Sequence, residues 1–215
     1  MKVLNLYACL GGNRLLWDNC EVTAVELDPE AARLYQERFP NDKVIVADAH
    51  QYLLEHYKEF DFIWSSPPCP THSKVRFSQH TKESHIPKYA DMKLYQEIIF
   101  LDNYFKGKYV VENVIPYYEP LIPAKKRGRH LYWTNFLLPT NVGNRKSVNW
   151  ARTKDEITAW NDFHNYDFNK YKGTQRRDKI ARNLVDYEVG KTIFDTARGI
   201  INKKDTKQTS IFDEL

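Results

Sequence analysis

Short apolar runs alternate with helix-like segments along the first half of the chain. The apolar runs have the length of buried strands, and they fall at residues 3–7, 22–26, 44–47, 62–64 and 109–111. Helical periodicity or capping signals, such as Asp28 before Pro29, predict helices at residues 14–19, 29–39 and 89–103. This alternation predicts an α/β fold built on a doubly wound, mostly parallel sheet.

The later part of the chain adds strands, a helix and a tail. Apolar runs at residues 131–133 and 136–138 predict a closing pair of strands. Residues 178–201 repeat apolar side chains at helical spacing, and we expect this helix to pack back on the sheet. The expected organisation is a main domain, a basic and aromatic insert, a helical segment and a disordered polar tail, at residues 1–140, 141–178, 179–201 and 202–215.

Composition narrows the class of protein without fixing it. The 215 residues carry a formal net charge of +4, and this mild basicity is compatible with a nucleic-acid partner. The three cysteines form no paired framework, which favours a reducing, cytoplasmic location. The sequence shows neither a signal peptide nor an apolar run long enough to cross a bilayer, so we expect no membrane partner.

Chemically useful groups stand at the ends of the first three predicted strands. Residues 7–12, Tyr-Ala-Cys-Leu-Gly-Gly, form a glycine-rich turn that lets a cofactor approach the backbone. Glu26 ends the second strand, where a carboxylate can bind both hydroxyls of a ribose. Asp48 ends the third strand and could accept a hydrogen bond from an adenine amino group. Each acid could instead be a helix cap, but the three groups together predict a nucleoside-bearing cofactor.

The fourth strand runs into Pro67, Pro68 and Cys69. The two prolines stop the strand and stiffen the backbone, so the thiol is held at the sheet edge where open α/β folds bind ligands. A buried structural cysteine is the alternative. The spacing Cys69-x2-His72 also permits a pair of zinc ligands, although no second pair supports it. Glu112 ends the fifth strand and is expected to face the same cleft.

These residues, in this order, resemble the cytosine-carbon-5 DNA methyltransferases, in particular the small type found in bacteriophages. The family's cofactor motif is similar to residues 7–12, its Pro-Cys nucleophile motif to Pro68-Cys69, and its Glu-Asn-Val motif to residues 112–114. Its arginine motif corresponds to residues 125–129, Lys-Lys-Arg-Gly-Arg, and the likeness covers residues 1–138. Amino-group methyltransferases share the Ser-Pro-Pro that precedes Cys69, but they carry an aromatic residue in place of the cysteine.

The resemblance implies a chemistry. Cys69 would supply a nucleophilic thiolate, and Glu112 would bind ring nitrogen 3 of cytosine. Arg129 would hold the carbonyl oxygen of the ring, and Arg127 would position the arginine pair or a phosphate. The implied cofactor is S-adenosylmethionine, with no metal. The residues expected to bind the cofactor are Tyr7, Ala8, Gly11, Gly12, Asn13, Glu26, Leu27, Asp48, Ala49 and Pro67.

DNA is the expected partner, with the target cytosine flipped out of the duplex to reach the thiol. A loop over residues 71–88 is expected to fill the gap in the duplex. The insert supplies further cations for phosphates. The target-recognition region is very small, and an insert of this size can read only a short or degenerate site unless a partner helps. The residues expected to contact DNA are Ser73, Lys74, Arg76, Arg145, Lys146, Arg176 and Arg177.

The chain departs from the family pattern at four places. Cys9 occupies the position of the first glycine, Pro70 and Lys125 each replace a glutamine, and the late Gly-Asn-x-Val motif has no counterpart, since Gly143-Asn144 lies too early. The reduced recognition region leaves open an RNA cytosine-5 methyltransferase. Cys9 and the missing late motif leave open a catalytically weak DNA-binding subunit.

The tail carries a second candidate partner motif. Residues 208–212, Gln-Thr-Ser-Ile-Phe, resemble the short peptide by which bacterial replication proteins dock on the sliding clamp. Gln208 would anchor one subsite, while Ile211 and Phe212 would fill a hydrophobic pocket. The alternatives are that these two side chains dock on the protein's own surface, or that so short a match arose by chance.

Overall fold

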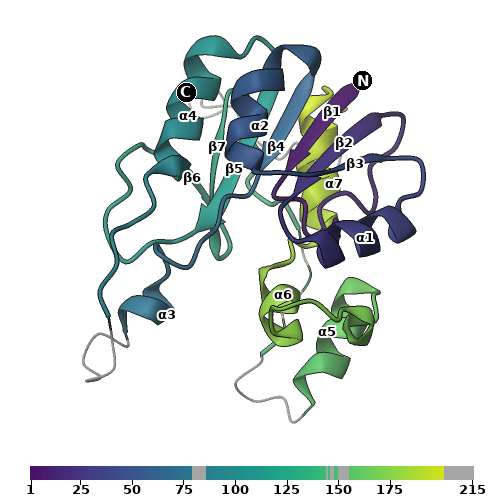
Figure 1. The fold of residues 1–215 in the computed structure, drawn as a ribbon. Helices are drawn as coiled ribbons and strands as arrows, with labels where there is room; N and C mark the ends of the chain where they lie inside the picture. The colour runs from purple at the N-terminus through teal and green to yellow at the C-terminus, as the bar shows by residue number, and fades with distance from the viewer. Residues whose placement is uncertain (79–85, 144, 146–147, 150–154, 201–215) are drawn as a thin grey trace, which may run out of the picture.

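The computed structural model describes residues 1–78, 86–143, 145, 148–149 and 155–200, and a seven-stranded sheet forms its centre (Figure 1). Five strands are parallel: β1 (Lys2–Leu6), β2 (Glu21–Glu26), β3 (Lys43–Val46), β4 (Phe62–Ser65) and β5 (Lys108–Val114). β7 (His130–Thr134) pairs antiparallel with β5, and β6 (Lys125–Arg127) with β7. The order β3-β2-β1-β4-β5-β7-β6 confirms the predicted α/β fold and its mostly parallel sheet.

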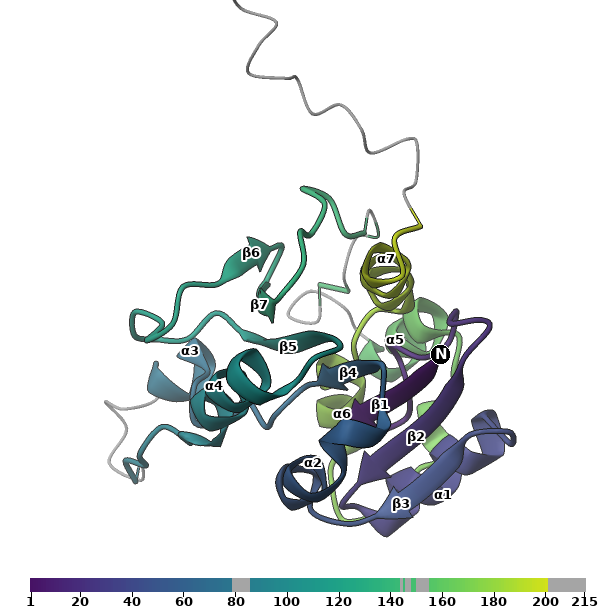
Figure 2. The same ribbon diagram turned by 90° about the horizontal axis from the view of Figure 1, so that it is seen from above.

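Helices cover both faces of the sheet (Figure 2). α2 (Ala49–His56) and α4 (Lys93–Tyr104) lie on one face, and α1 (Pro29–Arg38) and α7 (Tyr187–Ala197) lie on the other. α1 begins as the sequence predicts, because the Asp28 side chain accepts hydrogen bonds from the backbone nitrogens of Glu30 and Ala31. A short 3-10 turn, η1 (Tyr57–Glu59), follows α2. Among the described residues, no helix is both long enough and apolar enough to span a bilayer.

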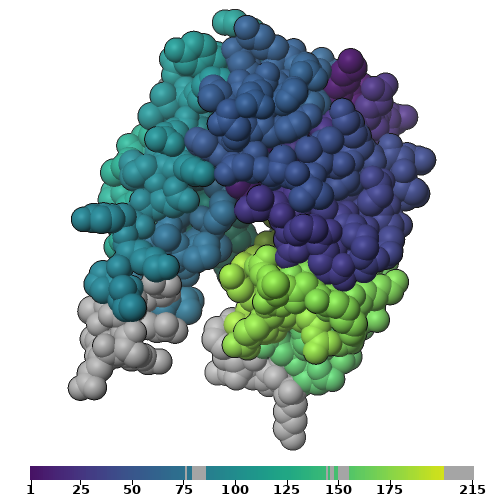
Figure 3. Space-filling view, in the orientation of Figure 1, coloured from purple at the N-terminus to yellow at the C-terminus, as the bar shows by residue number. Residues whose placement is uncertain are grey.

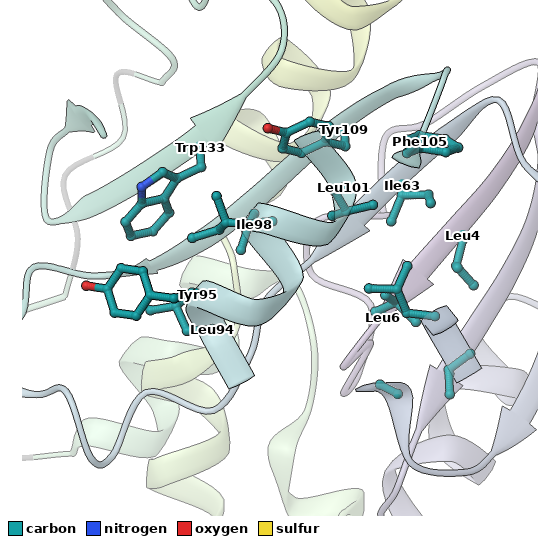
Figure 4. Packing of buried hydrophobic residues seen from close by; sticks show 14 of the residues in the cluster. Leu4, Leu6, Ile63, Leu94, Tyr95, Ile98, Leu101, Phe105, Tyr109 and Trp133 are labelled. Carbon is teal, nitrogen blue, oxygen red and sulfur yellow. The ribbon is translucent and has the colours of Figure 1, made fainter. Parts of the chain in front are cut away.

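The larger part of the core fills the face covered by α4. Aliphatic side chains of β1 and β4 pack against the apolar stripe of this helix, as Leu4, Ile63 and Leu101 show (Figure 4). These three side chains are fully buried. The packing fixes the carboxyl ends of the strands, where the chemically useful residues stand.

An aromatic cluster fills the opposite face. The ring of Trp17 stacks on that of Phe194, with centroids 4.9 Å apart, and both contact Phe62 of β4. Because Phe194 belongs to α7, the C-terminal helical segment packs back on the sheet as expected. The expected single helix is nevertheless broken into α6 (Arg177–Asn183) and α7, with residues 184–186 between them.

Two local predictions are wrong. Residues 14–19 form turns instead of a helix, since the Trp17 indole donates to the carbonyl oxygen of Gly190, and the Arg14 guanidinium binds Asp42. Residues 136–138 form no strand, and the partner of β7 is β6 instead. The Lys125 ammonium donates to the carbonyl oxygens of Thr134 and Phe136, so the chain turns away after β7.

The described part of the insert forms a small helical unit. The insert contributes α5 (Glu156–His164) and the 3-10 turn η3 (Phe168–Lys170), and α6, which begins at the end of the insert and extends beyond it, completes the unit. Trp160 and Phe168 are buried in it and pack with Leu34 of α1, so these aromatic residues belong to the core. The molecular surface is hollowed between this unit and the segment that carries α3 (Lys74–Phe77) (Figure 3).

Candidate active site

One cavity of about 820 Å³ opens at the carboxyl ends of the parallel strands. Open α/β sheets bind their ligands at this edge. All the residues predicted to bind the cofactor line it, except Gly11. Cys69 and Glu112 line the same cavity, and residues 173–175, 179–180 and 182–185 border it on the side of α6. The structure therefore brings the predicted cofactor residues and the predicted reactive residues into one space.

The carboxylate of Glu26 is held in place at the end of β2. Its Oε2 accepts a hydrogen bond from the Cys9 backbone nitrogen and its Oε1 one from the Asp28 backbone nitrogen, both at 2.8 Å. Burial raises the pKa of Glu26, although these backbone hydrogen bonds act against the shift. Each oxygen keeps acceptor capacity for a hydroxyl. Next to it, Leu27 is 66% exposed and offers an apolar surface to a flat ring.

Asp48 caps α2 and lines the cavity at the same time. Its Oδ1 accepts hydrogen bonds from the backbone nitrogens of His50 and Gln51, at 2.8 and 3.2 Å. Its Oδ2 lies 3.5 Å from the Lys93 ammonium, which lines the cavity as well. The capping role considered for this acid is therefore real, and it leaves Oδ2 able to accept a bond from a ligand amino group.

The turn after β1 has an unusual backbone. Tyr7, Cys9 and Gly11 have φ values of 55°, 47° and 68°, in the left-handed region that costs a non-glycine residue about 1–2 kcal/mol. A Cβ atom on Gly12 would lie 2.3 Å from the carbonyl oxygen of Val185, so this glycine lets the segment after α6 pass. A Cβ atom on Gly11 would meet the rings of Phe39 and Tyr35, which accounts for its absence from the cavity lining.

Two side chains of this turn are fixed by buried polar partners. The Tyr7 hydroxyl donates to Glu97 Oε1 at 2.5 Å, and the Ser65 hydroxyl donates to Glu97 Oε2 at 2.6 Å. The Asn13 amide donates to Asn5 Oδ1 at 2.8 Å. Burial and the neighbouring Glu26 raise the pKa of the Cys9 thiol to about 12. Cys9 therefore borders the cavity as a neutral thiol at neutral pH.

Cys69 follows the two prolines in an irregular turn that β5 holds down. The Asn113 side chain donates from Nδ2 to the Pro67 carbonyl oxygen at 2.9 Å. The Cys69 carbonyl oxygen in turn accepts hydrogen bonds from the backbone nitrogens of His72 and Ser73. Burial and the nearby Glu112 carboxylate raise the pKa of the Cys69 thiol to about 11. The thiol is thus well positioned but largely protonated in this state.

Glu112 is 7% exposed and lies on β5 beside β7. The two arginines predicted to share its chemistry lie elsewhere, because neither lines the cavity. Arg127 donates to the carbonyl oxygens of Leu138 and Pro139 and so fixes the chain after β7. Arg129 is exposed in the turn between β6 and β7, next to Gly128 with its φ of 56°.

A histidine that the sequence did not single out takes the place beside Glu112. His130 lines the cavity, and its Nε2 lies 3.6 Å from Glu112 Oε1. The sequence contained a signal for it, because His130 directly follows the arginine motif. Neighbouring residues in a strand face opposite sides of the sheet, so the residue after Arg129 could face Glu112 in its place.

The late motif also has a counterpart in the structure. Asn183, Leu184 and Val185 line the cavity beside Gly12 and supply the Asn-x-Val of the sought pattern, with Arg182 where the pattern has glycine. These residues are thus a candidate counterpart that the sequence analysis did not find. The sequence signal was an Asn-x-Val between two helices, and the expected single helix over residues 178–201 concealed it.

The residues predicted to contact DNA lie in different surroundings. Lys74 is exposed on α3, Ser73 accepts a hydrogen bond from the Val75 backbone nitrogen, and Arg76 lies on α3. Arg145 is engaged within the protein, with its guanidinium 3.0 Å from Asp186 and packed on the Phe163 and Tyr187 rings.

Arg176 and Arg177 remain exposed at the start of α6. Arg176 pairs with Asp178, and Arg177 donates to Asn169 at 2.7 Å. Lys146, the Arg76 side chain, part of the loop over 71–88 and the tail with Gln208, Ile211 and Phe212 lie outside the described residues.

Among the described residues, no group of three or more His, Cys, Asp or Glu side chains is placed to hold a metal ion. The His72 ring of the candidate zinc pair is buried, and its Nδ1 lies 2.5 Å from the Tyr118 hydroxyl.

Comparison with protein families gives a match over the part of the chain that builds this site. The model of the family described as C-5 cytosine-specific DNA methylase matches residues 1–115. Among curated proteins, the tRNA1(Val) (adenine(37)-N6)-methyltransferase of Haemophilus influenzae is 29% identical over 113 residues, covering 45% of this chain. The chain spans about half the length of that relative, 48%.

Solved structures give weaker matches. A DNMT2 mutant of Spodoptera frugiperda aligns with 24% identity over 53% of this chain and 35% of its own, with a TM-score of 0.35. A putative DNA modification methyltransferase encoded within an Escherichia coli prophage aligns with 20% identity over 55% and 33%, with a TM-score of 0.37. A TehB-like SAM-dependent methyltransferase of Corynebacterium glutamicum aligns with 14% identity over 62% and 78%, with a TM-score of 0.41.

Proposed function

Since the chain belongs to the C-5 cytosine-specific DNA methylase family, we propose that it is a DNA cytosine-5 methyltransferase that acts through a covalent adduct on Cys69. The observation that carries the proposal is the single cavity lined by Glu26, Asp48, Cys69 and Glu112. An acid for a ribose, an acceptor for an adenine, a thiol and a second acid are the groups that this reaction requires. They come from the carboxyl-end regions of four different strands. The fold of the sheet therefore brings these groups together, although they are far apart in the sequence.

The cavity fits S-adenosylmethionine. Glu26 has acceptor capacity for a pair of hydroxyls, Leu27 offers an apolar surface to the adenine, and Asp48 Oδ2 can accept from its amino group. Gly12 and residues 183–185 border the rest of the cavity. When bound, this cofactor supplies the methyl group.

The protein's own residues would prepare the cytosine. The Cys69 thiolate adds to carbon 6, and the electron pair of the ring double bond moves toward carbon 4 while nitrogen 3 takes a proton from Glu112. Carbon 5 thereby becomes nucleophilic and can accept the methyl group. After a base removes the carbon-5 proton, the carbon–sulfur bond breaks, Cys69 leaves as thiolate and the nitrogen-3 proton returns to Glu112.

The substrate would be a cytosine flipped out of duplex DNA. The surface is hollowed between the segment that carries α3 and the α5–α6 unit (Figure 3), and these two segments carry the exposed cations Lys74, Arg176 and Arg177. Cations on both sides of a groove suit a phosphate backbone. Ser73, Arg76, Arg145 and Lys146 were proposed for the same role, and Arg145 is the member already engaged inside the protein.

The test is a methylation assay with the purified full chain. Duplex DNA and RNA of matched cytosine content are incubated with S-adenosylmethionine, and 5-methylcytosine is measured by mass spectrometry. We expect product in DNA, none with Cys69→Ser, and a covalent adduct of wild type with DNA that carries 5-fluorocytosine. Product in RNA alone would instead establish the RNA methyltransferase. Cofactor and DNA binding without product or adduct would establish the binding subunit.

A further inference from the structure

Strand geometry places His130 on the same side of the sheet as Glu112. In the antiparallel pair of β5 and β7, Glu112 stands opposite Tyr132 and Val114 stands opposite His130. Residues two apart along a strand share a face, so Glu112 and His130 are diagonal neighbours on one face. Leu131 points to the other face, where it joins the core under α4.

The two arginines of the motif before His130 do not line the cavity. The Arg127 guanidinium is bound to the carbonyl oxygens of Leu138 and Pro139, and Arg129 lies in the exposed turn. The Tyr132 ring is buried at 6.5 Å from the imidazole, between centroids. Within the described residues, His130 is thus the basic side chain that both lines the cavity and reaches Glu112, at 3.6 Å.

We propose that His130 is a positioning residue that holds the Glu112 carboxyl in place and balances its charge when its proton passes to the cytosine ring. The inference rests on the proposed function. As sulfur adds to carbon 6, Glu112 gives its proton to nitrogen 3 and becomes a carboxylate. The His130 ring then donates an N–H to that carboxylate and, in its protonated form, neutralises it. When Cys69 leaves, the nitrogen-3 proton returns to Glu112, so no proton is gained or lost over the cycle at this pair.

The decisive experiment is chemical rescue of His130→Ala in the full chain. The truncated side chain leaves space beside Glu112 that free imidazole can enter from the cavity. We expect kcat for DNA methylation to fall roughly 10- to 100-fold while KM for DNA changes little, because the lost interaction acts in the reaction and not in DNA binding. Added imidazole is expected to restore a large part of kcat, and a merely structural role for His130 would not produce this recovery.

Two matched controls accompany the rescue. His56 on α2 also forms an exposed pair with a glutamate, its Nδ1 lying 2.7 Å from Glu59, and it does not line the cavity. His56→Ala should therefore keep the wild-type kcat, and added imidazole should not change it. Glu112→Ala should lose activity with His130 still in place, since the group that bonds nitrogen 3 is then missing.

Each outcome is informative. Full kcat in His130→Ala, or a lost kcat that imidazole does not restore in a variant that still binds S-adenosylmethionine, would overturn the inference. If His130→Ala fails to fold, His130→Gln serves instead, because glutamine donates but cannot carry the proton, and wild-type activity in that variant would overturn the inference. A wild type that makes no 5-methylcytosine overturns the proposed function itself and the inference with it.

Discussion

The side chain of Asn113 donates a hydrogen bond to the carbonyl oxygen of Pro67 at 2.9 Å, across the gap between β5 and the turn that follows β4. Asn113 is 2% exposed, and its own Oδ1 accepts from the Val114 backbone nitrogen at 2.9 Å. The bond joins the strand that carries Glu112 to the turn that carries Cys69. This hydrogen bond therefore helps to fix the position of Cys69 relative to Glu112.

Asn113→Ala should reduce methylation more than it reduces cofactor binding. Removing the amide leaves the Pro67 carbonyl oxygen without its donor, which costs about 1–3 kcal/mol of stability. It also frees the Pro-Pro-Cys turn, and a small misplacement of a nucleophile can lower a rate about 100-fold. Thermal unfolding, S-adenosylmethionine binding and kcat are measured on the same preparation.

The matched control is Asn135→Ala. Its side chain also joins two backbone groups, Gly107 and Tyr109, but at the opposite end of β5. This variant should lose stability and keep kcat. Equal loss of kcat in both variants would mean that Asn113 acts through overall stability alone.

The reactivity of Cys69 should depend steeply on pH in the absence of DNA. Burial and the Glu112 carboxylate raise the pKa of the thiol to about 11, so below that pH the thiolate fraction rises about tenfold with each pH unit. Alkylation of Cys69 by iodoacetamide, followed by peptide mass spectrometry, should therefore accelerate from pH 7 to pH 10 without levelling off. The urea-unfolded chain is the control, and its cysteines should level off near their ordinary pKa. A plateau below about pH 9 in the folded chain would contradict the assignment.

The sequence predicts the fold and brings together the residues proposed to bind the cofactor because those features are local. Asp28 before Pro29 starts a helix by short-range hydrogen bonds, and Glu26 and Asp48 stand at strand ends that any parallel sheet gathers at one edge. A resemblance in motif order over residues 1–138 then identifies the chemistry that those ends can support.

The rest depends on contacts between distant segments. Which of Arg129 and His130 faces Glu112 is decided by the register of β7 on β5, and a shift of one residue exchanges them. The break between α6 and α7 places Asn183 and Val185 at the cavity, although the apolar spacing over residues 178–201 reads as one helix. The engagement of Arg145 by Asp186 is likewise a tertiary contact that a count of basic residues does not reveal.

Replacing Arg176 and Arg177 by alanine should weaken DNA binding and flatten its dependence on salt. Each phosphate contact that is lost reduces the magnitude of the slope of log K against log salt concentration by about 0.9. The slope of the double variant should therefore be smaller in magnitude by about 2. The control is the double variant Lys106→Ala/Lys108→Ala, which removes the same charge near the amino end of β5, at the sheet edge away from the cavity. Equal slopes in the two variants would place the arginines away from the DNA. Binding is measured by fluorescence anisotropy over a salt series.

The tail should bind a replication sliding clamp through Gln208, Ile211 and Phe212. The proposal rests on the sequence of residues 208–212, which follows the polar stretch Lys-Lys-Asp-Thr-Lys. A glutamine and two apolar side chains at this spacing can fill adjoining subsites of a hydrophobic pocket, and a tether of this kind raises the local concentration of an enzyme at newly copied DNA without any new contact in its active site.

Clamp binding is measured for the full chain, for a chain that ends at Lys207 and for the full chain with Phe212→Ala. We expect binding at micromolar clamp by the full chain only, while all three proteins methylate free DNA equally, because no described residue after Val185 lines the proposed active site. Equal clamp binding by wild type and Phe212→Ala would show that the apolar pair does not enter a pocket. If the full chain does not bind the clamp, the five-residue match arose by chance. Electrostatic attraction would then be what brings the enzyme to its DNA.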